Sequence, residues 1–225
     1  MSHRKPRTGT VGRTAVRLGM LTTVCLTGLA TMNPAGAVTG SRITGGVGIA
    51  VDEARSLANP RHRVDHDEEF TIHQLGTVVG AGVRNRAIAR SVGCSIDAPC
   101  RSIALSFQVV TTNGAAGLNA SNTSKAVNDH CEGCETFAGA YQFIVSTPFR
   151  FTLSPSTRDE LAGYEGRLAA LERSGEPIDV VKGHADALAA EVVTLLRQGV
   201  AAAPHGETVD PLGSRPTVTL RRHID

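Results

Sequence analysis

Two blocks of this 225-residue sequence match each other at an offset of 34 residues, and this match restricts the possible folds more than any other feature. The blocks cover residues 100–110 and 134–144, and their Cys, Ala and Gln positions are identical. Upstream, Asn and Ala stand nine and five residues before Cys94 and again before Cys131. A fixed offset of this kind indicates that one structural unit occurs twice. The sequence therefore predicts two copies of a single supersecondary unit.

Both blocks alternate large apolar residues with small or polar ones at a period of two. The large residues are Ile103, Leu105, Phe107 and Val109 in the first copy, and Phe137, Tyr141, Phe143 and Val145 in the second. Alternation over this length predicts half-buried β-strands. Residues 83–92 and 120–129 supply the preceding strands, so each copy is expected to form an antiparallel hairpin with its cysteines at the turn. The alternative is a helix that begins at the second cysteine, because residues 135–140 are helix-permissive.

A different pattern begins at Ser154-Pro155, where proline suits the first turn of a helix. Leucines and a tyrosine recur at helical spacing up to residue 171, and a second apolar series runs from Val181 to Leu195. This spacing predicts an antiparallel helical hairpin over residues 154–199. The expected fold class is α+β: a small antiparallel sheet from two repeated β-hairpins, followed by a helical hairpin that packs on it. Packing of the helices on each other or on a second molecule is the alternative.

The N-terminal segment has the layout of a secretory signal peptide. Residues 1–37 carry five basic side chains, then an apolar stretch from Leu18 to Met32, then small residues up to Ala37. Cleavage is predicted after Ala37, and an uncleaved signal anchor is the alternative because the apolar run is short for a membrane span. Removal leaves 18 basic and 21 acidic side chains. The mature chain is then acidic, which removes the electrostatic argument for nucleic-acid binding.

Composition divides the rest of the chain. All aromatic residues lie between residues 70 and 164, which places the core there. We expect a flexible N-terminal arm over 38–69, a duplicated Cys-pair region over 70–153 and a disordered tail over 200–225.

An even number of cysteines in an exported protein favours disulfide bonds. The four candidates after the N-terminal segment are Cys94, Cys100, Cys131 and Cys134. The symmetry of the repeat favours the pairs 94–100 and 131–134, whereas chain entropy favours pairing between repeats, because longer loops gain more from closure. A thiol-redox site at Cys131 and Cys134 is an alternative, although the acidic residues around it oppose thiolate formation. Zinc held by the four cysteines, with His130 as an added ligand, is another.

Gln108 and Gln142 occupy the same position of the repeat, on the face that carries small residues. They are interpreted as satisfied polar contacts or solvent-facing side chains, with a paired ligand-contacting site as the alternative. The chain contains no G-x-S-x-G, H-E-x-x-H or phosphate-binding glycine loop. No motif therefore gives a reason to assert an enzyme or a catalytic residue.

At the repeated blocks and the Leu153-Ser154-Pro155 helix start, the chain resembles a family of uncharacterised exported proteins of GC-rich bacteria, which have a duplicated C-x-x-C…A-x-A-[FY]-Q block and a C-terminal helical hairpin. The resemblance spans about residues 80–199. The first cysteine pair departs from it, because five residues separate Cys94 from Cys100. Some relatives are labelled as zinc metalloproteases. This chain contains no H-E-x-x-H motif, so that activity is not expected here.

Together these observations predict a secreted or cell-surface protein that contains disulfides, needs no cofactor and acts as a non-enzymatic interaction protein. Its partner would be a protein or a component of the envelope. Contact with the membrane would occur only through an uncleaved signal segment. The alternative function is that of a thiol-redox or zinc-binding protein.

Overall fold

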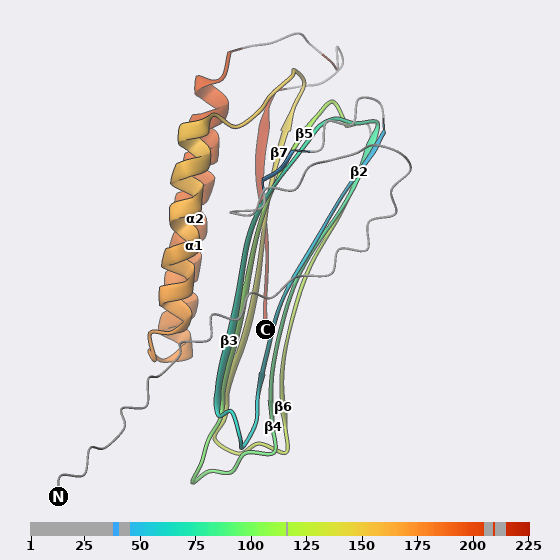
Figure 1. The fold of residues 1–225 in the computed structure, drawn as a ribbon. Coiled ribbons are helices and arrows are strands. Elements are labelled where there is room, and N and C mark those ends of the chain that lie inside the picture. Colours follow the sequence, from blue (N-terminus) through green and yellow to red (C-terminus); the bar gives the residue numbers. More distant parts are fainter. Residues whose placement is uncertain (1–37, 41–45, 116, 205–208, 210–214) are drawn as a thin grey trace, which may run out of the picture. The chain divides into compact units, whose positions relative to one another are not determined.

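The computed structural model describes residues 38–40, 46–115, 117–204, 209 and 215–225, and Figure 1 shows their arrangement. Along the chain, the elements are β1 (Val38–Gly40), β2 (Val47–Ala58), β3 (Val64–Thr77), β4 (Gly80–Val92), β5 (Arg101–Asn113), β6 (Gly117–Asp129), β7 (Glu135–Thr147), α1 (Pro155–Glu172), α2 (Ile178–Ala202) and β8 (Thr217–Ile224). The predicted signal peptide, residues 1–37, lies outside the described residues.

The long strands alternate between two sheets as the chain proceeds. One sheet has the order β1-β3-β5-β7-β8, and the other, here called sheet B, has the order β2-β4-β6. Strands β2, β4 and β6 are parallel to one another, as are β3, β5 and β7. Among the strands that the structure describes, β8 alone pairs in the antiparallel sense, with β7. Successive strands therefore form coils that stack side by side, each coil contributing one strand to each sheet.

This topology shows that the expected α+β class, with a small antiparallel sheet from two repeated β-hairpins, is wrong. Strands β4 and β5 were expected to pair with each other, but they belong to different sheets. The eight residues 93–100 between them span the separation of two packed sheets, which is about 10 Å. Each strand instead pairs with its counterpart in the next coil, and Ile103 lies beside Phe137 at the offset of 34 residues. The helix alternative for 135–140 also fails, because those residues belong to β7.

Burial on both faces explains why the central strands are parallel. Along β5, Ala104, Ser106 and Gln108 face sheet B, while Ile103 and Phe107 lie in the core under the helices, and all are buried. Antiparallel hairpins commonly leave one face to solvent, whereas parallel strands are covered on both. Small side chains between the sheets allow the two backbones to pack closely. They form a cluster of Ala54, Ala87, Ala89, Ala104, Ala138 and Ala140.

The segment expected to form a helical hairpin contains α1 and α2, which lie side by side over the β3-β5-β7 face (Figure 1). Ser154 caps α1, because its Oγ accepts a hydrogen bond from the Thr157 amide at 3.1 Å. The Tyr141 hydroxyl donates to Asp186 Oδ1 of α2 at 2.9 Å. Burial and this hydrogen bond raise the pKa of Tyr141, so its hydroxyl keeps its proton. The helices thus cover one sheet only.

Side chains from the larger sheet occupy both free edges of sheet B. On β2, the Arg55 amide donates to Asp67 of β3 and the Leu57 amide donates to Asp65, both at 2.6 Å. On β6, the Ser124 amide donates to His223 Nδ1 of β8 at 3.0 Å. Unpaired strand edges invite pairing with another chain, and polar side chains that occupy the edge amides oppose it.

The described residues at both ends of the chain differ from the expected arm and tail. Residues 47–58 and 64–77 form β2 and β3, and residues 217–224 form β8. Asp65 and Asp67, in the segment expected to form a flexible arm, belong to the part of β3 that does not pair with β1, and they bind the edge amides of β2. Charge in this segment therefore joins the two sheets and does not serve solvation alone.

Glu172 is a carboxyl group buried at the end of α1, with only 3% of its surface exposed. Burial is the main cause that raises its pKa to about 10, and the neighbouring Glu68 and Asp67 raise it further. Burial, then Asp52 and Asp67, also raise the pKa of Glu69 to about 7. Both carboxyls are protonated in the folded chain at a pH where the unfolded chain has lost those protons.

We therefore expect stability to fall as pH rises. The folded state binds more protons than the unfolded state between pH 4.5 and 7 at Glu69, and between pH 4.5 and 10 at Glu172. Glu172→Gln should flatten this decline and increase the free energy of unfolding at pH 8 by about 1 kcal/mol or more. Urea unfolding at pH 5, 7 and 9 measures this, with the exposed Glu160→Gln as control. A Glu172→Gln decline as steep as that of the unchanged chain would contradict it.

Candidate functional site

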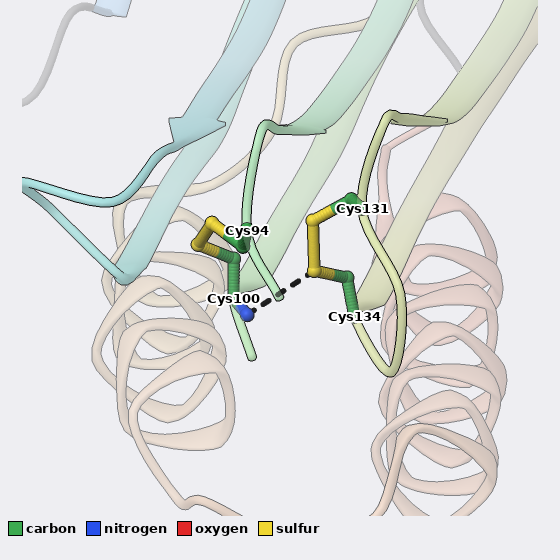
Figure 2. A group of neighbouring side chains, drawn as sticks. All are labelled: Cys94, Cys100, Cys131 and Cys134. Carbon is green, nitrogen blue, oxygen red and sulfur yellow. Dashed lines mark hydrogen bonds between the residues drawn. A yellow bond between two sulfur atoms is a disulfide. The ribbon is translucent and has the colours of Figure 1, made fainter. Parts of the chain in front are cut away.

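The four cysteines lie together at one end of the stacked coils (Figure 2). Cys94 follows β4 and Cys100 precedes β5, while Cys131 follows β6 and Cys134 precedes β7. Because β4 is in register with β6 and β5 with β7, the two turns are neighbours. The in-register sheets thus bring together cysteines that are up to 40 residues apart in the sequence.

The predicted presence of disulfide bonds is confirmed. Cys94 bonds to Cys100 and Cys131 bonds to Cys134, with Cα–Cα distances of 5.9 and 5.8 Å. These are the pairs that the repeat symmetry favours, and chain entropy does not decide the pairing. Each bond closes one turn between the two sheets, so it links a strand of sheet B to a strand of the larger sheet.

The two disulfides lie in contact with each other and differ in their exposure to solvent. The Sγ atoms of all four cysteines lie within 4.8 Å of one another. The Cys100 amide donates a hydrogen bond to Cys134 Sγ at 3.2 Å, shown as the dashed line in Figure 2. Cys94 and Cys100 are buried, whereas Cys131 and Cys134 are half-buried. The second bridge is therefore the more accessible to a reagent in solution.

His130, considered as an added metal ligand, is not part of this sulfur cluster. Its side chain is 93% exposed, and its Nδ1 lies 2.7 Å from Asp129 Oδ1. Arg90 and His130 hydrogen-bond to the Asp129 carboxylate and lower its pKa. The histidine therefore belongs to a surface hydrogen-bonded pair with its neighbour on the same turn.

Gln108 and Gln142 lie side by side between the two sheets and are fully buried. Gln142 Nε2 donates to Gln108 Oε1 at 2.8 Å, and Gln108 Nε2 donates to Asp52 Oδ2 at 2.5 Å. The same carboxylate oxygen accepts a bond from the Thr71 hydroxyl and lies 2.8 Å from His73 Nε2. The two glutamines thus form a hydrogen-bonded row that crosses three coils. Their burial leaves no surface for a ligand to reach.

A second row of hydrogen-bonded side chains runs through sheet B, from the buried Asn85 to the half-buried Asn122. Asn85 Nδ2 donates to Asn122 Oδ1 at 3.0 Å and to the carbonyl oxygens of Ser106 and Tyr141. The Ser106 hydroxyl donates back to Asn85 Oδ1 at 2.5 Å. In the sequence, these asparagines stand at matched positions before Cys94 and Cys131. The sequence does not show that their side chains point toward the other sheet. They join the two sheets by side-chain hydrogen bonds.

The outer face of sheet B is the main surface feature that the motifs do not reveal. Val47, Ile49 and Val51 of β2 project from it, and Ile49 is 72% exposed. The face also carries the exposed cations Arg55, Arg84, Arg86, Arg90 and Lys125. Glu53 pairs with Arg55 and Arg86, and Asp129 pairs with Arg90. Among the described residues, neither Arg84 nor Lys125 forms an ion pair, so the face has an excess of positive charge.

Comparison with known proteins adds no relative, since no family model, no curated protein and no solved structure matches the chain. The two disulfides fit an extracellular protein. Neither of the described helices is long and apolar enough to span a bilayer.

Proposed function

We propose that this chain is an exported, non-enzymatic interaction protein whose binding surface is the outer face of sheet B. Three observations support export: the signal-like residues 1–37, the paired cysteines, and the position of the predicted cleavage site. Cleavage after Ala37 leaves β1, which begins at Val38, complete. Mass spectrometry of the exported protein should find Val38 as its first residue, and an intact first segment would contradict cleavage.

The unequal covering of the two sheets is the single observation that carries the binding proposal. The outer face of β3-β5-β7 holds the aromatic core under α1 and α2, so it has no surface to offer. The corresponding face of sheet B has exposed valines and an isoleucine in an alternating strand. Exposed apolar residues that gather in one place commonly mark an interaction site.

The chemistry of this face favours a protein partner with an acidic surface. The excess cations Arg84 and Lys125 match carboxylates, and charge complementarity of this kind accelerates association. A charged polymer without apolar groups would leave Val47, Ile49 and Val51 in water. Three strands of twelve or thirteen residues make a face roughly 40 Å long and 14 Å wide, or about 560 Å². Stable interfaces bury about 800 Å² per partner, so we expect a reversible complex.

Site-specific photo-crosslinking in the native producing cells tests this function. A photoreactive residue at Ile49 or Arg84 should give a discrete adduct with an acidic protein, identified by mass spectrometry. The same residue at Glu160, exposed on α1, is the matched control and should give none. Adducts from the helix position alone, no adduct at all, or an adduct containing only two copies of this chain would contradict the proposal.

Charge reversal separates specific binding from chance contact. Arg84→Glu together with Lys125→Glu should reduce the yield of the Ile49 adduct at least tenfold, because two favourable charges become repulsive. Arg84→Lys together with Lys125→Arg keeps the charge and should retain the adduct. Equal yields from the two double variants would show that the positive charge of this face has no role.

A further inference from the structure

We propose that the four cysteines, when reduced, form a tetrathiolate site for one zinc ion. The Sγ atoms of these cysteines all lie within 4.8 Å of one another. In a tetrahedral zinc site with Zn–S bonds of about 2.3 Å, the sulfur atoms stand about 3.8 Å apart. Reduction frees the two sulfur atoms of each bridge to move apart, and side-chain rotation that also contracts the largest separation by about 1 Å completes the geometry. This inference is independent of the proposed binding face.

The fold, and not the sequence spacing, assembles this ligand set. Five residues separate Cys94 from Cys100, and thirty separate Cys100 from Cys131, which exceeds the spacing of common zinc ribbons. The intervening β5 and β6 run out along one sheet and return along the other, so the chain comes back to the same end. Each of two adjacent turns then contributes two sulfur atoms.

A backbone hydrogen bond favours the ionised form of one sulfur atom, in spite of the acidic residues near Cys131 and Cys134. The Cys100 amide already donates to Cys134 Sγ at 3.2 Å. A backbone amide that bonds to a sulfur lowers the free energy of its thiolate, and such bonds orient the ligands of a metal. Ala58 of the preceding coil packs against Cys94 and Cys100 from the opposite side. The half-buried Cys131 and Cys134 leave a path by which a metal ion enters.

A trialkylphosphine reduces each disulfide to two thiols, takes up one water oxygen and becomes the phosphine oxide. The four thiols then bind Zn²⁺ as thiolates and release their protons. The same two turns are thus crosslinked by disulfide bonds in the oxidised chain and by a zinc ion in the reduced chain. His130, paired with Asp129 at the surface, takes no part.

Cobalt titration of the reduced full-length chain tests the site. Cys25 is first replaced by serine, so that the four cysteines of the turns are the only sulfur ligands of this type. After phosphine reduction, we expect one equivalent of Co²⁺ to give the intense absorption of tetrahedral tetrathiolate cobalt, which zinc then abolishes. Circular dichroism should show that the zinc-loaded chain keeps its strands. The oxidised chain should bind neither metal.

Variants decide whether both turns act together. Cys94→Ala and Cys131→Ala should each weaken zinc binding about 100-fold or more and remove the tetrathiolate absorption, whereas His130→Ala should bind zinc like the parent. Several results would overturn the proposal: no metal bound by the reduced chain, one metal ion per cysteine pair, loss of metal from His130→Ala, or unfolding of the zinc-loaded chain.

Discussion

Replacing Ile103 with alanine should lower the free energy of unfolding by about 3 kcal/mol, whereas Ile49→Ala should change it by less than about 0.5 kcal/mol. Both isoleucines project outward from long strands, one on each sheet. Ile103 is 1% exposed because α1 and α2 cover its face, while Ile49 is 72% exposed. The same chemical change thus leaves a cavity at one position and only removes exposed surface at the other.

Urea denaturation of the two variants, followed by circular dichroism under oxidising conditions, measures this difference. The pair is matched in residue type and strand position, so intrinsic strand propensity affects both variants in the same sense. Equal losses at Ile103 and Ile49 would mean that the face of sheet B is covered in solution, or that the helices leave the other sheet. Either result would contradict the unequal covering on which the proposed binding face depends.

Asn85→Ala should be about as damaging, with a loss of about 3 kcal/mol. Asn85 is fully buried and bonds through Nδ2 to Asn122 and to two backbone carbonyl oxygens, and through Oδ1 to the Ser106 hydroxyl. Alanine removes all of these hydrogen bonds at once and leaves the groups that made them without Asn85 as a partner. Polar groups that remain buried without a partner carry their full cost of desolvation.

The control for this change is Asn119→Ala, at an exposed position of β6. The loss there should be within about 0.5 kcal/mol. Thermal and urea unfolding give both values. A loss below about 1 kcal/mol at Asn85 would show that the side chain does not join the two sheets, and that the buried rows contribute little to the fold.

The sequence predicts the strands of the cysteine-containing blocks but not how they pair. The alternation of Ile103, Leu105 and Phe107 with small residues requires extended chain in β5, as found. The same pattern is compatible with an antiparallel hairpin, because a period of two describes one strand and says nothing of its neighbour. Burial of Gln108 on the second face was the missing information, since a strand covered on both sides is typical of parallel sheets.

The N-terminal strands were missed because of their charge and their lack of large side chains. In β2 the inward positions include Ala50, Ala54 and Ala58, so the alternation is weak in hydrophobicity, although it is regular in size. In β3, Asp65 and Asp67 resemble a solvated arm until their bonds to the edge amides of β2 are seen. This part of β3 lies beyond its short pairing with β1, and a free strand edge accommodates charged side chains.

In the cysteine region, the sequence predicts which cysteines pair but not that the two disulfides lie close together. Repeat symmetry favours the pairs that the structure contains, because each bond closes one turn. The closeness of the two bonds depends on the register of β4 with β6 and of β5 with β7, and the spacing of cysteines along the chain does not reveal it. No sequence motif marks the outer face of sheet B. That face is exposed because both helices pack on the other sheet.

Nuclear Overhauser effects between backbone protons test the stacking of parallel coils most directly. In the isotopically labelled, oxidised protein, we expect interstrand contacts that join β5 to β7 at a constant offset of 34 residues, from Ile103 beside Phe137 onward, and β4 to β6 at an offset of 37. Contacts that join β4 to β5 in opposite directions, as in a hairpin closed at the cysteine turn, would contradict the stacked coils.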